Sequence, residues 1–166
     1  MLNRGWRVVT VDNEPKFNPD YIADVCTWSW EGERPDLIWA SPPCVEFARE
    51  SMPWCRTGQK PDLSVWEGCQ RIINESQPMY WIIENVRGAM PWFGKPREIH
   101  GAFYLWGFFP LLGNVDLSGV RKKESYYSKD RELRAKIPEQ LSLAVARAVE
   151  LQMSFEHDQE RESTDL

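Results

Sequence analysis

The sequence lacks any apolar run of membrane-spanning length, and no signal peptide opens it. It has only two histidines, and its four cysteines show neither paired spacing nor a neighbouring histidine cluster. We therefore expect neither a metal site nor a disulfide framework. These absences favour a protein of the reducing cytoplasm without a membrane partner.

The chain has 166 residues, of which 42% are hydrophobic and nine are tryptophan, enough for one globular domain with a core. Its net charge is −5, an unusual sign for a protein that binds nucleic acid. Much of this charge lies between Glu156 and Leu166, where acids outnumber bases. We expect a folded domain over residues 1–153 and an acidic, disordered tail over 154–166.

Two prolines directly before Cys44 mark the most informative segment. Leu37–Ala40 is a short apolar run with the length and composition of a buried strand. Pro42 and Pro43 end this strand and place Cys44 on a stiff loop at its carboxyl end. Open α/β sheets bind ligands at that edge, so Cys44 is a candidate nucleophile. Cysteines more often pack as small hydrophobes. We expect that role for the other cysteines, Cys26, Cys55 and Cys69.

A second apolar segment, Met79–Val86, also has the pattern of a strand, and it ends in Glu84 and Asn85. If the two strands are parallel, their carboxyl ends meet at one sheet edge. The sequence therefore predicts that Cys44 and Glu84 lie on the same edge.

This pair of motifs, Pro42-Pro43-Cys44 and then Glu84-Asn85-Val86, resembles the C5-cytosine DNA methyltransferases. The resemblance runs from about Gly5 to about Glu150 and is closest to short, phage-type members without a large target-recognition domain. It implies an α/β S-adenosylmethionine-dependent methyltransferase (Rossmann-like) sheet, DNA as the partner, and a restriction-modification role in a bacterial or phage-infected cell. It also implies that Cys44 attacks C6 of a flipped cytosine, that Glu84 holds the ring at N3 and the exocyclic amine, and that Asn85 belongs to the same catalytic motif.

The family binds S-adenosylmethionine through acids that follow the early strands. Arg7–Asp12 and Tyr21–Val25 are expected strands, and a strand-end acid can accept hydrogen bonds from ribose hydroxyls. The alternative for Asp12 is an ordinary turn or cap residue, and we expect Trp28 and Trp30 to pack rather than stack on a cofactor. The resemblance assigns the following residues to the cofactor: Asp12, Asn13, Asp24, Val25 and Pro42.

Bases concentrate between Arg121 and Lys136, around Tyr126 and Tyr127. Such runs are usually solvated surface, but this one falls where longer family members keep their recognition domain, so phosphate contacts are an equal alternative. The family also places an arginine near the reacting base. The candidate DNA-binding residues are Arg97, Lys122, Lys123 and Arg131.

Three further elements follow from periodicity and capping. Asp62 is a candidate N-cap for a helix that Pro78 ends. Ala102–Phe109 has the pattern of an aromatic strand, and Ile137-Pro138 opens a helix with Leu141, Val145 and Val149 on one face.

The chain lacks the Phe-x-Gly-x-Gly loop that cradles the methionine part of the cofactor in this family. We expect that the sheet lacks its first strand, because Met1–Gly5 resembles the end of the helix that follows that loop. An upstream segment or a second chain could supply the loop, or catalysis has been lost. Two rival functions follow: a zinc nucleobase deaminase, whose His-x-Glu and Cys-x-x-Cys motifs are absent, and a non-catalytic or truncated DNA-binding or assembly relative.

Overall fold

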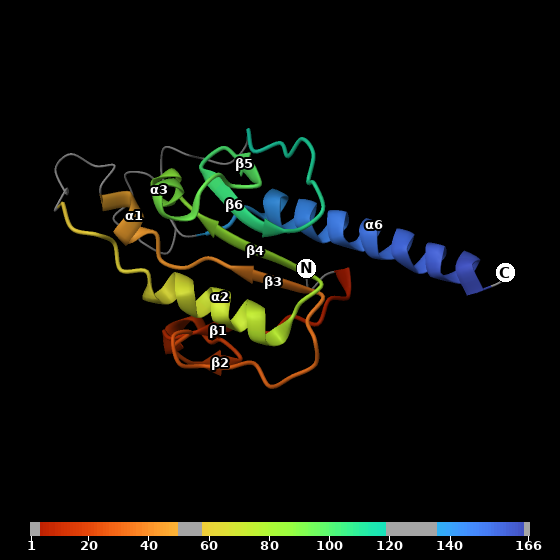
Figure 1. The fold of residues 1–166 in the computed structure, drawn as a ribbon, viewed down its shortest axis with the longest axis horizontal. Coiled ribbons are helices and arrows are strands. Elements are labelled where there is room, and N and C mark those ends of the chain that lie inside the picture. Colours follow the sequence, from red (N-terminus) through yellow and green to blue (C-terminus); the bar gives the residue numbers. More distant parts are fainter. Residues whose placement is uncertain (1–3, 50–57, 119–135, 165–166) are drawn as a thin grey trace. The chain divides into compact units, whose positions relative to one another are not determined.

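The structure is a computed structural model that describes residues 4–49, 58–118 and 136–164 (Figure 1). The chain divides into two compact units, which are described separately. One unit comprises Arg7–Phe109, and the other comprises Met1–Trp6 with Pro110–Leu166.

The larger unit contains a mixed sheet in the order β3-β4-β6-β5. β3 (Leu37–Ala40) and β4 (Tyr80–Asn85) pair in parallel, with Ala40 opposite Ile83. β6 (Phe103–Phe108) lies antiparallel to both β4 and β5 (Glu98–His100). The expected strands at Leu37–Ala40, Met79–Val86 and Ala102–Phe109 are confirmed to within two residues, and so is the α/β class.

β1 (Val11–Asp12) and β2 (Tyr21–Ile22) form a separate parallel pair. Both are shorter than the expected strands, because local hydrogen bonds turn the backbone away from the ladder. Asp20 accepts hydrogen bonds from the backbone N–H and hydroxyl of Thr10, at 2.8 and 2.7 Å. After β2, the backbone N–H of Cys26 donates a hydrogen bond to Oδ1 of Asp24 at 2.9 Å, and this bond closes a tight turn.

The N-cap of α2 (Ser64–Ser76) is Leu63, not Asp62 as expected. Asp62, one residue earlier, accepts a hydrogen bond from the backbone N–H of Ser64 at 2.9 Å. The helix ends at Gln77, whose left-handed backbone precedes Pro78. The other helices in the described part of this unit are short: the 3-10 helices η2 (Pro15–Phe17) and η3 (Arg87–Ala89), and the α-helices α1 (Val45–Arg49) and α3 (Met90–Phe93).

One face of α2 forms the core with one face of the four-stranded sheet. Trp66, Cys69 and Ile73 pack with Ile83 and Trp106. The Trp66 ring also stacks on Phe93, with centroids 3.5 Å apart. The expected burial of Cys69 is confirmed, whereas Cys26 is only half-buried and Cys55 lies outside the described residues.

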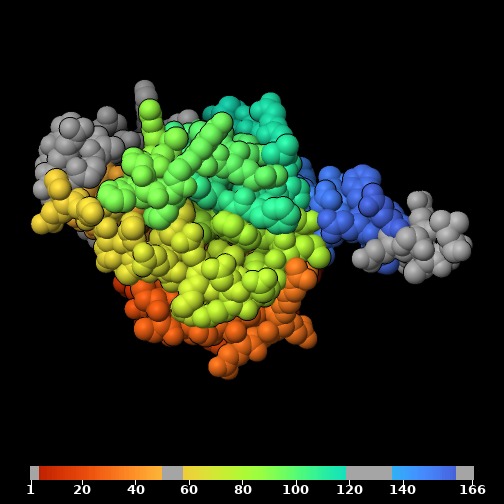
Figure 2. All heavy atoms as spheres, in the orientation of Figure 1, coloured from red at the N-terminus to blue at the C-terminus, as the bar shows by residue number. Residues whose placement is uncertain are grey.

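α2 also contacts the segment that follows β2, which Figure 2 shows in orange beside the yellow-green helix. A Cβ atom at Gly68 would lie 2.8 Å from the carbonyl oxygen of Val25, so glycine permits this close approach. Arg71 donates hydrogen bonds to the carbonyl oxygens of Val25 and Trp28, at 3.1 and 2.5 Å. α2 therefore holds both sheets of this unit.

In the smaller unit, α6 (Glu139–Thr164) follows Pro138, and the face with Leu141, Val145 and Val149 is fully buried, as expected. Arg4 and Trp6 both donate hydrogen bonds to the carboxylate of Glu150, which tie the amino-terminal segment to this helix.

α6 continues to Thr164, through the acidic segment from residue 154 for which the sequence predicts a disordered tail. Contacts one turn apart support this extension, such as the one between Gln152 and Glu156 at 3.1 Å. No helix within the described ranges is long and apolar enough to cross a membrane.

Candidate active site

The loop with Cys44 leaves the carboxyl end of β3, and α1 begins at the next residue. Cys44 is exposed, whereas Pro42 is buried. Because β3 and β4 are parallel and Ala40 pairs with Ile83, the residues that follow each strand lie at the same edge of the sheet. The predicted shared edge for the Cys44 loop and Glu84 is therefore present.

Asn85 connects the two strand ends directly. Its side chain is only 1% exposed, and its Nδ2 donates a hydrogen bond to the carbonyl oxygen of Pro42 at 3.1 Å. Its Oδ1 accepts a hydrogen bond from the backbone N–H of Val86 at 2.9 Å. Asn85 thus fixes the backbone just before Cys44 against the end of β4, which makes it a positioning residue.

Glu84 is partly buried at the end of β4, and burial raises the pKa of its carboxyl group from 4.5 to about 7. A hydrogen bond with Ser41 acts in the opposite direction and lowers this pKa. Near neutral pH, the protonated and the ionised forms of the Glu84 carboxyl group are therefore both populated. A carboxyl group in that state can both donate and accept a proton.

Ser41 and Trp39 are neighbours of Glu84 that sequence reasoning missed. The indole Nε1 of Trp39 donates a hydrogen bond to the Ser41 hydroxyl at 2.8 Å, and Ser41 in turn bonds to Glu84. The sequence did contain a signal for this pair. Trp39 and Ser41 are alternate residues at the end of a strand, so their side chains face the same side of the sheet, and Ser41 directly precedes the two prolines. This chain of contacts orients the Glu84 carboxyl group.

A close contact between α1 and η3 holds the far side of the Cys44 loop. A Cβ atom at Gly88 would lie 2.1 Å from the carbonyl oxygen of Phe47, so only glycine allows this packing. The Phe47 ring meets Phe93 edge-on, with centroids 5.5 Å apart. The helix that directly follows Cys44 is therefore anchored to the segment that follows Glu84.

Of the candidate cofactor residues, Asp12 is the last residue of β1 and Asp24 lies two residues beyond the carboxyl end of β2. Each uses its Oδ1 to accept a hydrogen bond from a backbone N–H two residues later, that of Glu14 at 2.8 Å and that of Cys26 at 2.9 Å. The turn role considered for Asp12 is thus present in the structure. Of their neighbours, Asn13 is exposed, and Val25 packs against the core.

Arg97, the candidate base-contacting arginine, lies just before β5 and is exposed. Its backbone N–H donates to the carbonyl oxygen of Leu105 at 2.8 Å, and Leu105 pairs with Glu84 across β6 and β4. Its guanidinium lies over the Phe109 ring, 5.4 Å from the centroid. The other candidates for DNA binding, Lys122, Lys123 and Arg131, lie outside the described residues.

Among residues 4–49, 58–118 and 136–164, no group of three or more histidine, cysteine or acidic side chains is arranged to hold a metal ion. No protein-family model, curated protein or solved structure matches the chain.

Proposed function

We propose that the chain is a C5-cytosine DNA methyltransferase, or a fragment of one, with an S-adenosylmethionine-type α/β sheet. One observation carries this proposal: Asn85 joins the Pro-Pro-Cys loop to the strand end that bears Glu84, whose pKa is raised to about 7. The site thus combines an exposed thiol on a stiff loop with a carboxyl group that is partly protonated at neutral pH.

This arrangement suits nucleophilic addition to a cytosine that has left the DNA helix. The Cys44 thiolate forms a bond to C6, and the electron pair of the C5–C6 double bond makes C5 nucleophilic. A proton from Glu84 neutralises the charge that develops at N3. S-adenosylmethionine would supply the methyl group that C5 accepts. The ring becomes aromatic again when water takes the C5 proton, the N3 proton returns to Glu84 and the Cys44 thiolate leaves C6.

The cofactor residues of the proposal are those at the ends of the two short strands. Oδ1 of Asp12 and of Asp24 already accepts a backbone hydrogen bond, and the Asp24 side chain also bonds to Cys26. The remaining lone pairs of these carboxylates would meet the ribose hydroxyls or the adenine amine. Asn13 and Val25, which directly follow these aspartates, complete the proposed cofactor residues on the two-stranded sheet. Pro42, the remaining one, lies at the edge of the four-stranded sheet, where its carbonyl oxygen accepts the hydrogen bond from Asn85.

The division of the larger unit into two sheets supports an added strand. Among the described strands, β1 pairs only with β2, and β3 pairs only with β4, so each has one open edge. α2 holds both sheets through Cys69 on one side and Arg71 on the other. We propose that an upstream segment or a second chain supplies a strand and the glycine loop, whose backbone N–H groups would approach the cofactor.

The second candidate is a non-catalytic DNA-binding or assembly relative, favoured by the absence of a Phe-x-Gly-x-Gly loop from the sequence. Transfer of a labelled methyl group from S-adenosylmethionine to DNA separates the two. The assay uses the chain alone and the chain with a strand and glycine loop fused before Met1. Label at cytosine C5 with either protein supports the enzyme, and its absence with both favours the non-catalytic relative.

A further inference from the structure

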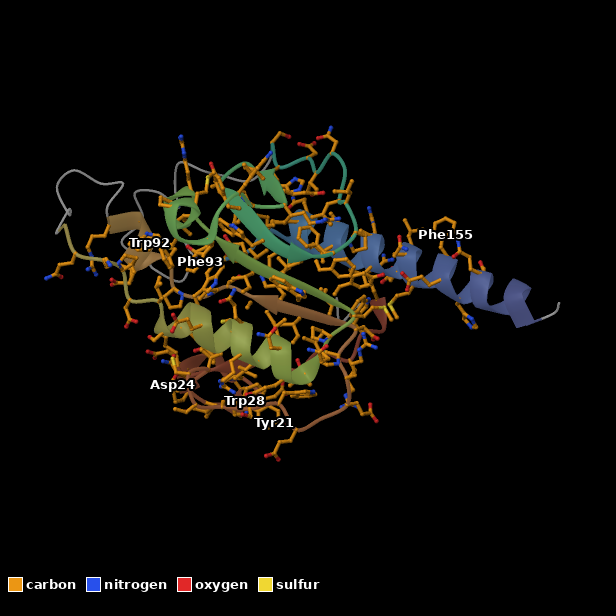
Figure 3. The ribbon with its side chains drawn as sticks, in the orientation of Figure 1. Tyr21, Asp24, Trp28, Trp92, Phe93 and Phe155 are labelled. Carbon is orange, nitrogen blue, oxygen red and sulfur yellow. The ribbon has the colours of Figure 1, made fainter. Side chains whose placement is uncertain are left out.

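An open hollow of about 580 Å³ lies beside β2, apart from the Cys44 loop. Its lining is Tyr21 together with the residues of the turn-rich segment that follows, Thr27, Trp28, Ser29, Trp30, Glu31 and Gly32. Tyr21 opens β2, whereas Asp24 follows its carboxyl end, so the hollow differs in place from the proposed cofactor site. Figure 3 shows Tyr21 next to Trp28 and Asp24 further along.

Three aromatic rings make up the apolar part of this hollow. The Tyr21 and Trp28 centroids are 5.5 Å apart with planes inclined by 49°, and those of Trp28 and Trp30 are 6.1 Å apart with planes inclined by 56°. Because the ring planes of neither pair are parallel, the three rings are not stacked face to face. Tyr21 keeps 47% of its surface exposed, and both tryptophans are partly exposed. These rings line a surface instead of filling the core.

The rings are held in place by contacts with the backbone. The Trp30 indole N–H donates to the carbonyl oxygen of Glu33 at 2.7 Å, and a Cβ atom at Gly32 would lie 2.2 Å from the Trp30 ring. The backbone N–H of Trp28 donates to the carbonyl oxygen of Asp24 at 2.9 Å, and its carbonyl oxygen accepts from Arg71. The site is therefore organised before any ligand arrives.

The charge around the hollow is negative. Glu31 lines it directly, and Asp20 and Glu33 are close to the lining residues in sequence. Three bases lie near these acids: Arg7 faces Glu33 at 4.0 Å, Arg34 donates to the carbonyl oxygen of Gln77, and Arg71 pairs with Glu75 at 2.7 Å while donating to the Ser29 hydroxyl. Glu31 is therefore the acid that faces the hollow itself. A carboxylate in the lining favours a cationic ligand over an anionic one.

Aromatic faces attract cations through their quadrupoles, and bulky, weakly hydrated quaternary ammonium groups gain most from such a site. We propose that Tyr21, Trp28, Trp30 and Glu31 bind a small soluble trimethylammonium compound of the choline class. The methyl groups contact the rings, and the Glu31 carboxylate balances the charge. The hollow is open to solvent, so a small free compound can reach the rings directly.

The test is a titration with choline, followed through the chemical shifts of the tryptophan indole N–H groups. The control ligand is 3,3-dimethylbutan-1-ol, which has the shape of choline but a carbon atom in place of the charged nitrogen. Choline should bind saturably and about tenfold more tightly than the neutral isostere. Equal binding of the two would overturn the proposal, because it would show an apolar hollow without cation recognition. No saturation with choline at about 100 mM would do the same.

Three variants locate the site. Trp28→Ala should abolish choline binding, and the exposed Trp92→Ala should leave it unchanged. Because Trp28→Ala could also unfold the segment, Glu31→Lys provides a surface change that preserves the rings. It should abolish choline binding while leaving binding of the neutral isostere within about twofold. Retained choline binding by Glu31→Lys, or its loss in Trp92→Ala, would contradict the assignment.

Discussion

Asn85 donates a hydrogen bond to the carbonyl oxygen of Pro42 over 3.1 Å, and this bond joins two strand ends that are 43 residues apart in the chain. The donor belongs to the Glu-Asn segment at the end of β4, and the acceptor lies two residues before Cys44. Removal of the buried amide would leave the Pro42 oxygen and the Val86 N–H without this partner.

We therefore expect Asn85→Ala to lower the free energy of unfolding by about 1–3 kcal/mol, the range for an orphaned buried polar group. The measurement is urea unfolding followed by tryptophan fluorescence. Asn74→Ala, at an exposed position of α2, is the matched control and should change stability by less than about 0.5 kcal/mol. Equal effects of the two substitutions would show that the Asn85 bond contributes no special stability.

Glu84 should make stability depend on pH in a defined window. Its pKa is raised from 4.5 to about 7 in the folded state, so between these values the folded chain holds a proton that the unfolded chain has lost. This contribution is present below about pH 4.5 and is lost as the pH rises through about 7. Relative to Glu84→Gln, the wild type should lose roughly 2–3 kcal/mol across this window. Parallel pH profiles of the two proteins would refute a raised pKa.

The same substitution should reduce methyl transfer. A complete enzyme with Glu84→Gln should turn over roughly 10²–10⁴-fold more slowly, the usual range for a positioned acid–base group. DNA affinity should change little, because Glu84 acts on the base only after it has been flipped. Single-turnover rates and DNA affinities measured in parallel check this expectation. Near-normal turnover would show that Glu84 has only a structural role.

Ser41 should tune the Glu84 carboxyl group. Because its hydrogen bond lowers the Glu84 pKa, Ser41→Ala should raise that pKa above its present value of about 7. Carbon-13 NMR titration of the labelled glutamate carboxyl groups measures the midpoint. Ser154→Ala on α6 is the control and should leave the midpoint where it is. A midpoint that falls in Ser41→Ala would contradict the proposed direction.

Lys122 and Lys123 test the predicted DNA contact in the basic segment. Replacing both with alanine should weaken binding to all DNA sequences alike. The slope of log affinity against log salt should become shallower by about one unit for each lost phosphate contact. An unchanged slope would show that DNA binds to another part of the chain.

Strong local signals predicted much of the framework. Leu37–Ala40 forms a strand because it is an apolar run that two prolines end. The start of α2 was predicted one residue early: Asp62 does bind the Ser64 N–H, but the N-cap is Leu63. The shared edge for the Cys44 loop and Glu84 followed from the carboxyl ends of parallel strands.

Other features depended on contacts between distant residues, which a sequence pattern does not contain. The bond from Asn85 to Pro42 and the approach of Gly88 to Phe47 are of this kind. β1 and β2 are short because Asp20 and Asp24 bind nearby backbone groups. The acidic composition after residue 154 suggested disorder, yet α6 continues there, because helical contacts one turn apart outweigh the low hydrophobicity.

The central claim is that Cys44 attacks C6 of cytosine. Duplex DNA with 5-fluorocytosine tests it most directly, because fluorine at C5 prevents the elimination that releases the enzyme after methyl transfer. In the presence of S-adenosylmethionine, the chain completed by a strand and glycine loop should form a covalent adduct that denaturing electrophoresis resolves. Peptide mapping should place the adduct on Cys44, and Cys44→Ser should abolish it. An adduct on Cys55 or Cys69, or one that persists in Cys44→Ser, would contradict the claim.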